Sequence, residues 1–249
     1  LQIDSGITLQ GFTQINQSNT AGIVNAGTIS ASGGTFTITP NTFTNSGTLE
    51  ATAGGTVNLS PNTSWTNSGL LSANGGTLTL AGPTSTNSGN LSVSPGGVLN
   101  LGGNLSSATL VGHFTRNAGT VNVTGVFNNT GQTLDVGDAG VFGVGGLNSA
   151  PGTITGGTII NSNATPVFNV ASSTLDGVTL GAAGNLNLTL NGAVTFANGL
   201  TLANGAVITR NNTSWGFTTT GLQRISTPGS ATIINNGSVI TAGVSVGGQ

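Results

Sequence analysis

Charged side chains are nearly absent from this chain. Among its 249 residues, 3 are Lys or Arg, 5 are Asp or Glu and 1 is His, which gives a net charge of −2. An ordinary soluble domain is about 25% charged. Nucleic-acid binding requires a basic surface, and most hydrolases and lyases require clustered carboxylates, His or Lys. The composition therefore predicts no nucleic-acid partner and argues against an enzyme.

Cysteine and methionine are missing as well. Without Cys the chain can form neither disulfides nor structural zinc sites of the thiolate type, and we expect no cofactor. No apolar run approaches the roughly 18 residues that a transmembrane helix requires. Because neither a Met nor a basic segment begins the chain, we expect a mature or internal piece of a longer protein.

What the chain does contain argues against disorder. Apolar residues make up 35% of it, mean hydropathy is +0.21, and 43 residues are glycine. Low charge and positive hydropathy are opposite to the signature of disordered segments. Abundant Gly, Thr, Ser and Asn with regularly placed Val, Ile and Leu are typical of short strands and tight turns.

The chain contains an internal repeat. Gly-Gly pairs begin at Gly33, Gly54, Gly75 and Gly96, in steps of 21 residues. An Asn-x-Gly triplet accompanies each pair, and its Asn residues advance in steps of 20, 22 and 20: Asn25, Asn45, Asn67 and Asn87. Helical hairpin repeats need about 33 residues or more, so the period excludes them.

Each repeat contains alternating apolar and polar runs, the period of a half-buried strand. The clearest run covers 35–38, 56–59 and 77–80, a second covers 28–31, 48–51, 71–73 and 91–93, and a third lies near Phe43, Trp65 and Ser85. Three short strands in 21 residues predict one coil of an all-β, right-handed parallel β-solenoid (β-helix). An antiparallel meander is disfavoured because each run resembles the run one repeat later rather than its neighbour. We expect both the Gly-Gly and the Asn-x-Gly corners to provide positive φ.

The repeat becomes less strict along the chain. Gly119-Thr120-Val121 and Phe127-Asn128-Asn129 still match earlier units, whereas later segments keep the alternation and lose the spacing. We therefore expect one solenoid over residues 1–249, with regular coils to about 105 and irregular coils over 106–249. A short separate β-domain at the C-terminal end is the alternative.

Two sets of polar residues follow from this register. The Asn-x-Gly residues Asn25, Asn45, Asn67 and Asn87 are expected to form an internal amide ladder with a structural role. The outward side of the most regular strands is expected to present a flat array, which is a candidate ligand face for ice or a glycan: Thr35, Thr37, Thr56, Asn58, Thr77 and Thr79. Val98 and Asn100 interrupt this array, and Thr suits exposed strand positions in any case.

The other chemically interesting residues are better explained by structure. His113 has no evident nucleophile or orienting acid. Asp135 and Asp138 could hold Ca²⁺ or act as a glycosidase pair, but the calcium-binding repeat motif and the supporting polar shell are missing. Trp65 and Trp215 could stack on sugars, although alignment with Phe43 favours a buried aromatic column.

The units Asn45-Ser46-Gly47-Thr48-Leu49 and Gly54-Gly55-Thr56-Val57, with their copies after Asn67 and Asn87, resemble the repeats of large secreted bacterial surface proteins. These are the filamentous-haemagglutinin-like exoproteins and autotransporter passenger domains. The resemblance implies an extracellular right-handed β-helix that acts as a stalk, fibre or adhesin. It provides no catalytic motif. Surface glycans are expected partners only of the Thr-rich face.

The sequence therefore predicts a structural repeat protein that builds a bacterial surface fibre, filament or adhesin stalk. Both termini alternate like strands, so we expect them to meet further coils or another copy head to tail. A ligand-binding adhesin that uses the Thr-rich face is the alternative, and an enzyme ranks third.

Overall fold

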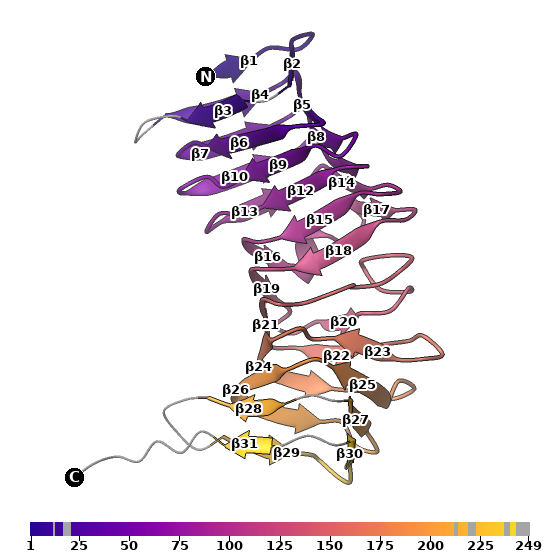
Figure 1. Ribbon diagram of the computed structural model, residues 1–249. Helices are drawn as coiled ribbons and strands as arrows, with labels where there is room; N and C mark the ends of the chain where they lie inside the picture. Colours follow the sequence, from indigo (N-terminus) through magenta and orange to yellow (C-terminus); the bar gives the residue numbers. More distant parts are fainter. Residues whose placement is uncertain (12, 17–20, 212–213, 219–222, 237–239, 243–249) are drawn as a thin grey trace, which may run out of the picture.

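The protein is an elongated stack of short parallel strands (Figure 1). The computed structural model describes residues 1–249 except 12, 17–20, 212–213, 219–222, 237–239 and 243–249. The chain forms a parallel β-solenoid of about 11 turns, with about 21 residues and three strands in a coil. This confirms the all-β solenoid predicted from the repeat. A single turn of 3-10 helix, η1 (Ser107–Thr109), is the one helical element in the described part of the chain.

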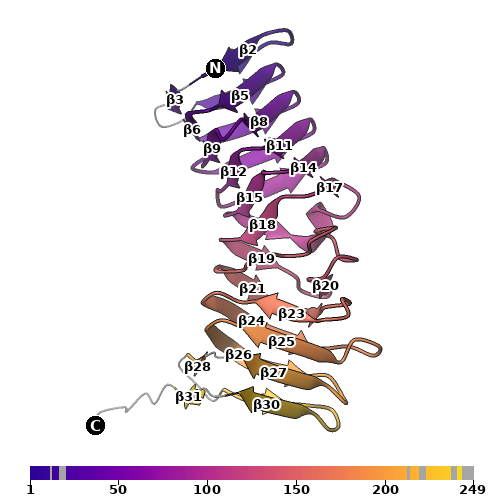
Figure 2. The same cartoon turned by 45° about the vertical axis from the view of Figure 1, so that its right-hand side comes forward.

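Three sheets form the sides of the first coils, and each contains one strand from each of the first five coils; Figure 2 labels the strands of two of these sheets. We call them sheets A, B and C. Sheet A contains β1 (Gln2–Ile3), β4 (Gly22–Asn25), β7 (Thr42–Asn45), β10 (Ser64–Asn67) and β13 (Ser85–Asn87). Sheet B contains β2 (Thr8–Gln10), β5 (Thr28–Ser32), β8 (Thr48–Thr52), β11 (Leu70–Asn74), β14 (Asn90–Val93) and β17 (Phe114–Arg116). Sheet C contains β3 (Thr13–Asn16), β6 (Thr35–Thr39), β9 (Thr56–Leu59), β12 (Thr77–Leu80), β15 (Val98–Leu101) and β18 (Thr120–Val123).

Later coils belong to two further sheets, D and E. Sheet D contains β16 (Asn104–Ser106), β19 (Val126–Asn128), β20 (Thr133–Asp135), β21 (Thr153–Thr155), β22 (Thr158–Ile160), β24 (Ser173–Leu180), β26 (Val194–Leu202), β28 (Trp215–Phe217), β29 (Ile225–Ser226) and β31 (Ile240–Ala242). Sheet E contains β23 (Val167–Asn169), β25 (Asn187–Asn191), β27 (Val207–Asn211) and β30 (Thr232–Asn236).

Equivalent residues of successive coils are in register. In sheet B, Leu49 lies opposite Leu71, which lies opposite Leu91. In sheet C, Val57 lies opposite Leu78. Because alternate side chains point to opposite faces of a strand, these residues form inward columns that merge into one continuous core. Each column is therefore buried by the coil above and the coil below it.

An aromatic column lies inside sheet A. Phe43 pairs with Trp65, and both side chains are about 1% exposed. Trp215 in sheet D is fully buried beside Phe196, with ring centroids 4.9 Å apart. The buried alternative for both tryptophans is confirmed, and neither indole face is open for stacking on a sugar.

Glycine is required at the two kinds of corner for different reasons. The expectation of positive φ is correct for the Gly-Gly corners and wrong for the Asn-x-Gly corners. The first residue of each Gly-Gly pair does adopt positive φ, as in Gly54 at +76°. The Asn-x-Gly glycines do not. A Cβ added to Gly69 would instead overlap the carbonyl oxygen of Gly47, and one at Gly47 would overlap that of Gly27. Backbones of stacked coils approach so closely at this corner that no side chain fits.

The coil changes shape in the second half of the chain. The corner between β21 and β22 is formed by Gly156 and Gly157, both at positive φ. In the following coil the corresponding residues form a single strand, β24, which pairs with both β21 and β22. A register shift at Asp176 and Val178 marks the former corner. Two sides of the early coils thereby become one bent sheet.

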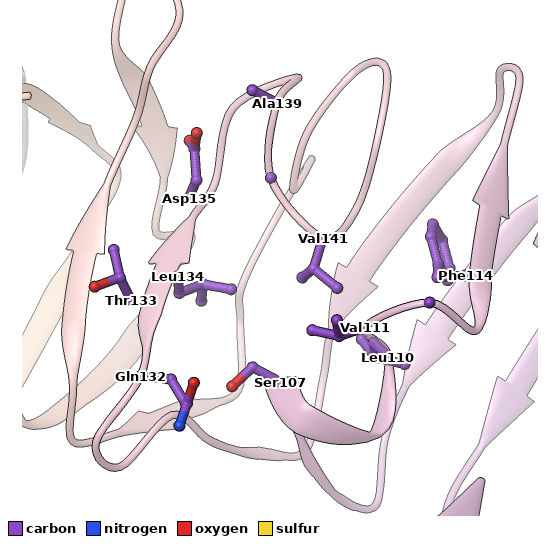
Figure 3. A pocket seen from close by; sticks show the side chains of 12 residues that line it. Ser107, Leu110, Val111, Phe114, Gln132, Thr133, Leu134, Asp135, Ala139 and Val141 are labelled. Atoms are coloured by element: carbon purple, nitrogen blue, oxygen red, sulfur yellow. The ribbon is translucent and has the colours of Figure 1, made fainter. Parts of the chain in front are cut away.

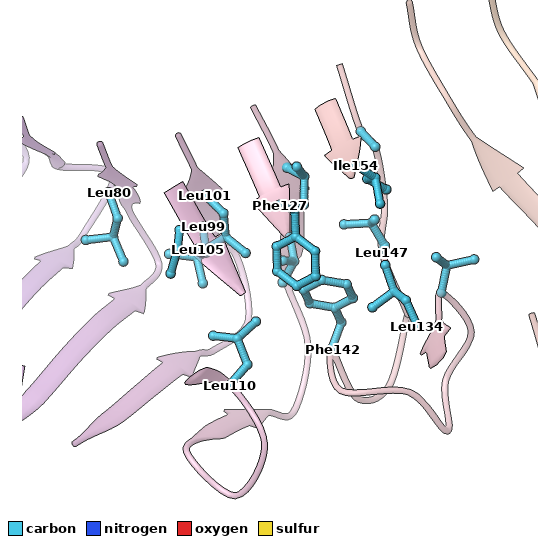
Figure 4. Close-up of a cluster of buried hydrophobic side chains, with 14 of the residues drawn as sticks. Leu80, Leu99, Leu101, Leu105, Leu110, Phe127, Leu134, Phe142, Leu147 and Ile154 are labelled. Carbon is cyan, nitrogen blue, oxygen red and sulfur yellow. The ribbon is translucent and has the colours of Figure 1, made fainter. Parts of the chain in front are cut away.

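The transition is filled by side chains from the segment between β20 and β21, residues 136–152, which we call the inserted loop. Phe142 is fully buried and lies 5.7 Å from Phe127 between ring centroids. Figure 4 shows it between Leu110 on one side and Leu134 on the other. The inserted loop therefore supplies the core where regular stacking stops.

Candidate functional site

The Asn-x-Gly residues form a chain of side-chain hydrogen bonds through the interior. Asn25 Nδ2 donates to Asn45 Oδ1 at 2.7 Å, Asn45 Nδ2 to Asn67 Oδ1 at 2.8 Å, and Asn67 Nδ2 to Asn87 Oδ1 at 2.7 Å. Each amide also donates to backbone oxygen, for example Asn45 Nδ2 to the Leu70 carbonyl at 3.1 Å. All four side chains are at most 7% exposed. Apart from Asn25 Oδ1, which is buried without a hydrogen-bond partner at the end of the ladder, these bonds satisfy polar groups that would be costly to bury alone.

The corner position stays polar beyond the four residues named from the repeat, although Asn87 Nδ2 donates to the Thr109 carbonyl at 3.2 Å rather than to Ser107. Ser107 occupies the next position, 20 residues after Asn87, and its hydroxyl donates to Asn129 Oδ1 at 3.2 Å. Asn129 is fully buried and donates to the carbonyls of Gln132 and Thr158. The spacing of the repeat would have identified Ser107, but a search for Asn at this position misses it because the residue is a serine. Asn129 is the last polar residue at this corner, which Gly156 and Gly157 form in the next coil and which is lost in the coil after that.

The candidate ligand residues do share one face. Thr35, Thr56 and Thr77 form one outward column of sheet C, and Thr37, Asn58 and Thr79 form the second. Thr35 is exposed and the others are partly exposed. Their column neighbours bond to one another, since Asn100 Nδ2 donates to Thr79 Oγ1 at 3.3 Å and Asn122 Nδ2 to Asn100 Oδ1 at 2.9 Å. The face is polar and uncharged, and its side chains partly satisfy each other.

Asp135 and Asp138 hold backbone in place. Asp135 accepts hydrogen bonds from the Gly137 and Ser162 amides and from the Ser162 hydroxyl. Asp138 accepts one from the Gly145 amide at 2.9 Å. No group of three or more His, Asp or Glu residues suited to a metal ion occurs in the described ranges. The two carboxylates serve loop geometry in this arrangement.

Two arginines have roles that the sequence analysis missed. Arg116 takes the inward position next to Val93, and its guanidinium donates to the carbonyls of Gly119 and Gly146 and to Asn148 Oδ1. Burial lowers the pKa of Arg116, and nearby Asp138 opposes that shift. The side chain therefore ties the inserted loop to the regular coils.

Arg210 lies in the core of sheet E. It is fully buried, and its Cζ lies 4.9 Å from the centroid of the Trp215 ring, an arrangement suited to a cation–π interaction. Burial lowers its pKa. The sequence did contain a signal for this burial: Arg210 follows the apolar Ile208 by two residues, and alternate residues of a strand face the same side.

One cleft of about 380 Å³ lies at the transition between regular and irregular coils (Figure 3). Its walls combine aliphatic and polar groups in similar measure; Leu110, Val111 and Val141 provide aliphatic side chains, and Figure 3 shows Leu134 across from them. Gln132, Thr133 and Asp135 provide polar groups. His113 does not line it, although Gly112 and Phe114 do.

No helix among the described residues is long and apolar enough to span a membrane. What the chain does must be inferred from its coils and surfaces. Comparison with protein-family models, with curated proteins and with solved structures finds no match to this chain.

Proposed function

We propose that this chain is a structural repeat protein of the bacterial cell surface, where stacked coils build a fibre, filament or adhesin stalk. The observation that carries the proposal is the continuous register of the regular coils, with the buried amide ladder from Asn25 to Asn87 running through them. Each regular coil presents nearly the same groups to the next, so further coils of this kind can be stacked through the same type of interface.

Near-neutral charge also supports assembly. The chain has a net charge of −2 and only eight formally charged Lys, Arg, Asp and Glu side chains, 3 basic and 5 acidic. Long-range repulsion between copies is therefore weak. We propose that copies or flanking coils join head to tail, by pairing of strands at the outer edges of the sheets.

Electron microscopy of the purified chain tests this function. Rods or filaments whose length grows with concentration are the expected result. Light scattering on the same material gives a second measure. A stable monomer at high concentration, with β1, β2 and β3 protected from hydrogen exchange, would contradict head-to-tail joining.

A second candidate function is ligand binding by the outward Thr and Asn columns of sheet C. The favouring observation is that all six predicted residues lie in register on one uncharged face. A glycan array and an ice-recrystallisation assay test it. Thr56→Lys in the middle of the face should abolish such binding, whereas Thr66→Lys on sheet A serves as the matched control.

Catalysis ranks below both functions in our proposal. Asp135 and Asp138 are engaged by backbone amides, which supports a loop role. If both residues are changed to Asn and a detected activity disappears while the fold is retained, an enzymatic function must be reconsidered.

A further inference from the structure

Sheet B is interrupted between two coils that are joined elsewhere. β17 is the last strand of sheet B, and β20 in the next coil pairs only with β22. The same two coils are connected on their other sides, where β16 pairs with β19 and Asn122 bridges Ser149. The cleft described above lies in this interruption, because Phe114 of β17 and the whole of β20 line it.

The hydrogen-bond register directs unpaired backbone groups of β20 toward the cleft. Thr158 N–H donates to the Gln132 carbonyl and Val136 N–H to the Ile160 carbonyl, both at 2.9 Å. Alternation along a strand then turns the N–H and C=O of Thr133 away from β22. Among the described residues, no strand pairs with that side of β20.

Not all of this edge is open. A Cβ added to Gly140 would overlap the Asp135 carbonyl, so the inserted loop covers that end of β20. Thr133 is exposed, and Val111 on the opposite wall is 65% exposed. The open part is therefore the Thr133 end of the strand, beside an aliphatic wall.

We propose that this cleft binds an extended, uncharged peptide segment, which adds to the Thr133 edge of β20 as a strand. Strand addition is a common mode of peptide recognition, in which main-chain bonds supply affinity and pockets for alternate side chains supply specificity. The aliphatic side chains of the cleft, Val111 and Val141 among them, receive one apolar side chain.

The intact coils indicate which peptide fits. At this level of sheet B they place an aliphatic residue inward between polar outward residues, as in Thr28-Ile29-Ser30. The volume of about 380 Å³ is at the lower end of the range for ligand sites. The Asp135 carboxylate is already bonded to Ser162 and Gly137, so a charged peptide finds no free counter-charge there.

The probe is a labelled, end-capped peptide with the sequence of residues 27–32, Gly-Thr-Ile-Ser-Ala-Ser, titrated by fluorescence anisotropy into the full chain. Binding should protect the Thr133 amide from hydrogen exchange. Val111→Asp should weaken binding by about tenfold or more, because the peptide would bury a charge. Val144→Asp is the matched control, since Val144 is 63% exposed and does not line the cleft.

A second variant tests the backbone edge itself. Thr133→Pro removes an N–H that faces the cleft without removing a bond to β22, and it should weaken binding about fivefold by loss of one hydrogen bond. Thr133→Val retains the N–H and should bind normally. A peptide in which the isoleucine is replaced by aspartate should not bind.

Three outcomes would overturn the proposal. The first is no binding at millimolar peptide. The second is binding that both variants leave unchanged, as expected if the peptide adds to the outer edge of β2 instead. The third is protection of Thr133 by methyl glycosides but not by the peptide, which would identify the cleft as a sugar site.

Discussion

At the scale of single residues, the interior combines polar ladders with apolar columns. Asn67 is 2% exposed and both accepts from Asn45 and donates to Asn87. Leu71, four residues later, is 1% exposed between Leu49 and Leu91. An apolar side chain in place of Asn67 or a polar one in place of Leu71 would be mismatched, because each residue packs against its own column in the coils above and below.

Asn67→Ala should therefore destabilise the fold by about 1–3 kcal/mol, since it leaves the Asn87 side-chain oxygen buried with its ladder donor removed. The midpoint of urea unfolding measures this effect. Thr66→Ala is the control, because Thr66 lies on the exposed side of the same strand. Equal shifts for the two variants would mean that the ladder contributes nothing to stability.

Leu71→Asp should unfold the coils around it or cost several kcal/mol, because an unpaired charge enters the core. Leu70→Asp, on the outward and only partly buried position, should be tolerated within roughly 1 kcal/mol. Circular dichroism during thermal unfolding compares the two. Comparable damage from both changes is incompatible with the observed register.

At the scale of elements, the corners decide how coils stack. Gly54 needs its conformation, since its φ is +76° and nothing lies within 4 Å of an added Cβ. Gly69 needs its smallness, because a side chain would overlap the Gly47 carbonyl. The same residue type thus serves two separate physical requirements at adjacent corners.

Gly54→Asn should cost less than about 1 kcal/mol, because Asn visits the left-handed region with little strain. Gly69→Asn should cost more than about 3 kcal/mol, as overpacking in a closely stacked region does. Denaturant midpoints of both variants give the comparison. A larger loss of stability for Gly54→Asn than for Gly69→Asn would contradict the steric explanation of the Asn-x-Gly corner.

At the scale of the whole molecule, stability should be a sum over coils and their interfaces. Deleting residues 66–85 joins Trp65 to Thr86, and Trp65 pairs with Ser85, so the deletion removes one coil and preserves every column. Asn87 then takes the place of Asn67 in the ladder. The molecule is thus built to lose or gain a unit without a change of fold.

We expect the chain lacking residues 66–85 to remain folded, with an unchanged β-type circular dichroism spectrum per residue and a modestly lower unfolding midpoint. Deleting 66–75 instead shifts strands out of their columns and should abolish cooperative unfolding. A folded product from the second deletion, or a disordered one from the first, would show that whole coils are not the units of stability.

Local periodicity made much of this architecture predictable. Strands, their parallel order and their inward columns follow from a 21-residue repeat, because each coil packs against a near copy of itself. The same spacing located Asn25, Asn45, Asn67 and Asn87 on one corner. Trp65 was assigned to the core by its alignment with Phe43.

Where contacts depend on segments that do not repeat, only the tertiary structure decided the outcome. Glycine is required at the Asn-x-Gly corner because the backbones of neighbouring coils approach closely there, and the sequence of one coil does not show this approach. Insertion of Phe142, the interruption between β17 and β20, and the merging of two sides into β24 all depend on how unequal coils are accommodated. Periodicity determines a structure as long as each coil meets its copy. Once neighbouring coils differ in length, packing between them determines which strands pair and which edges stay open.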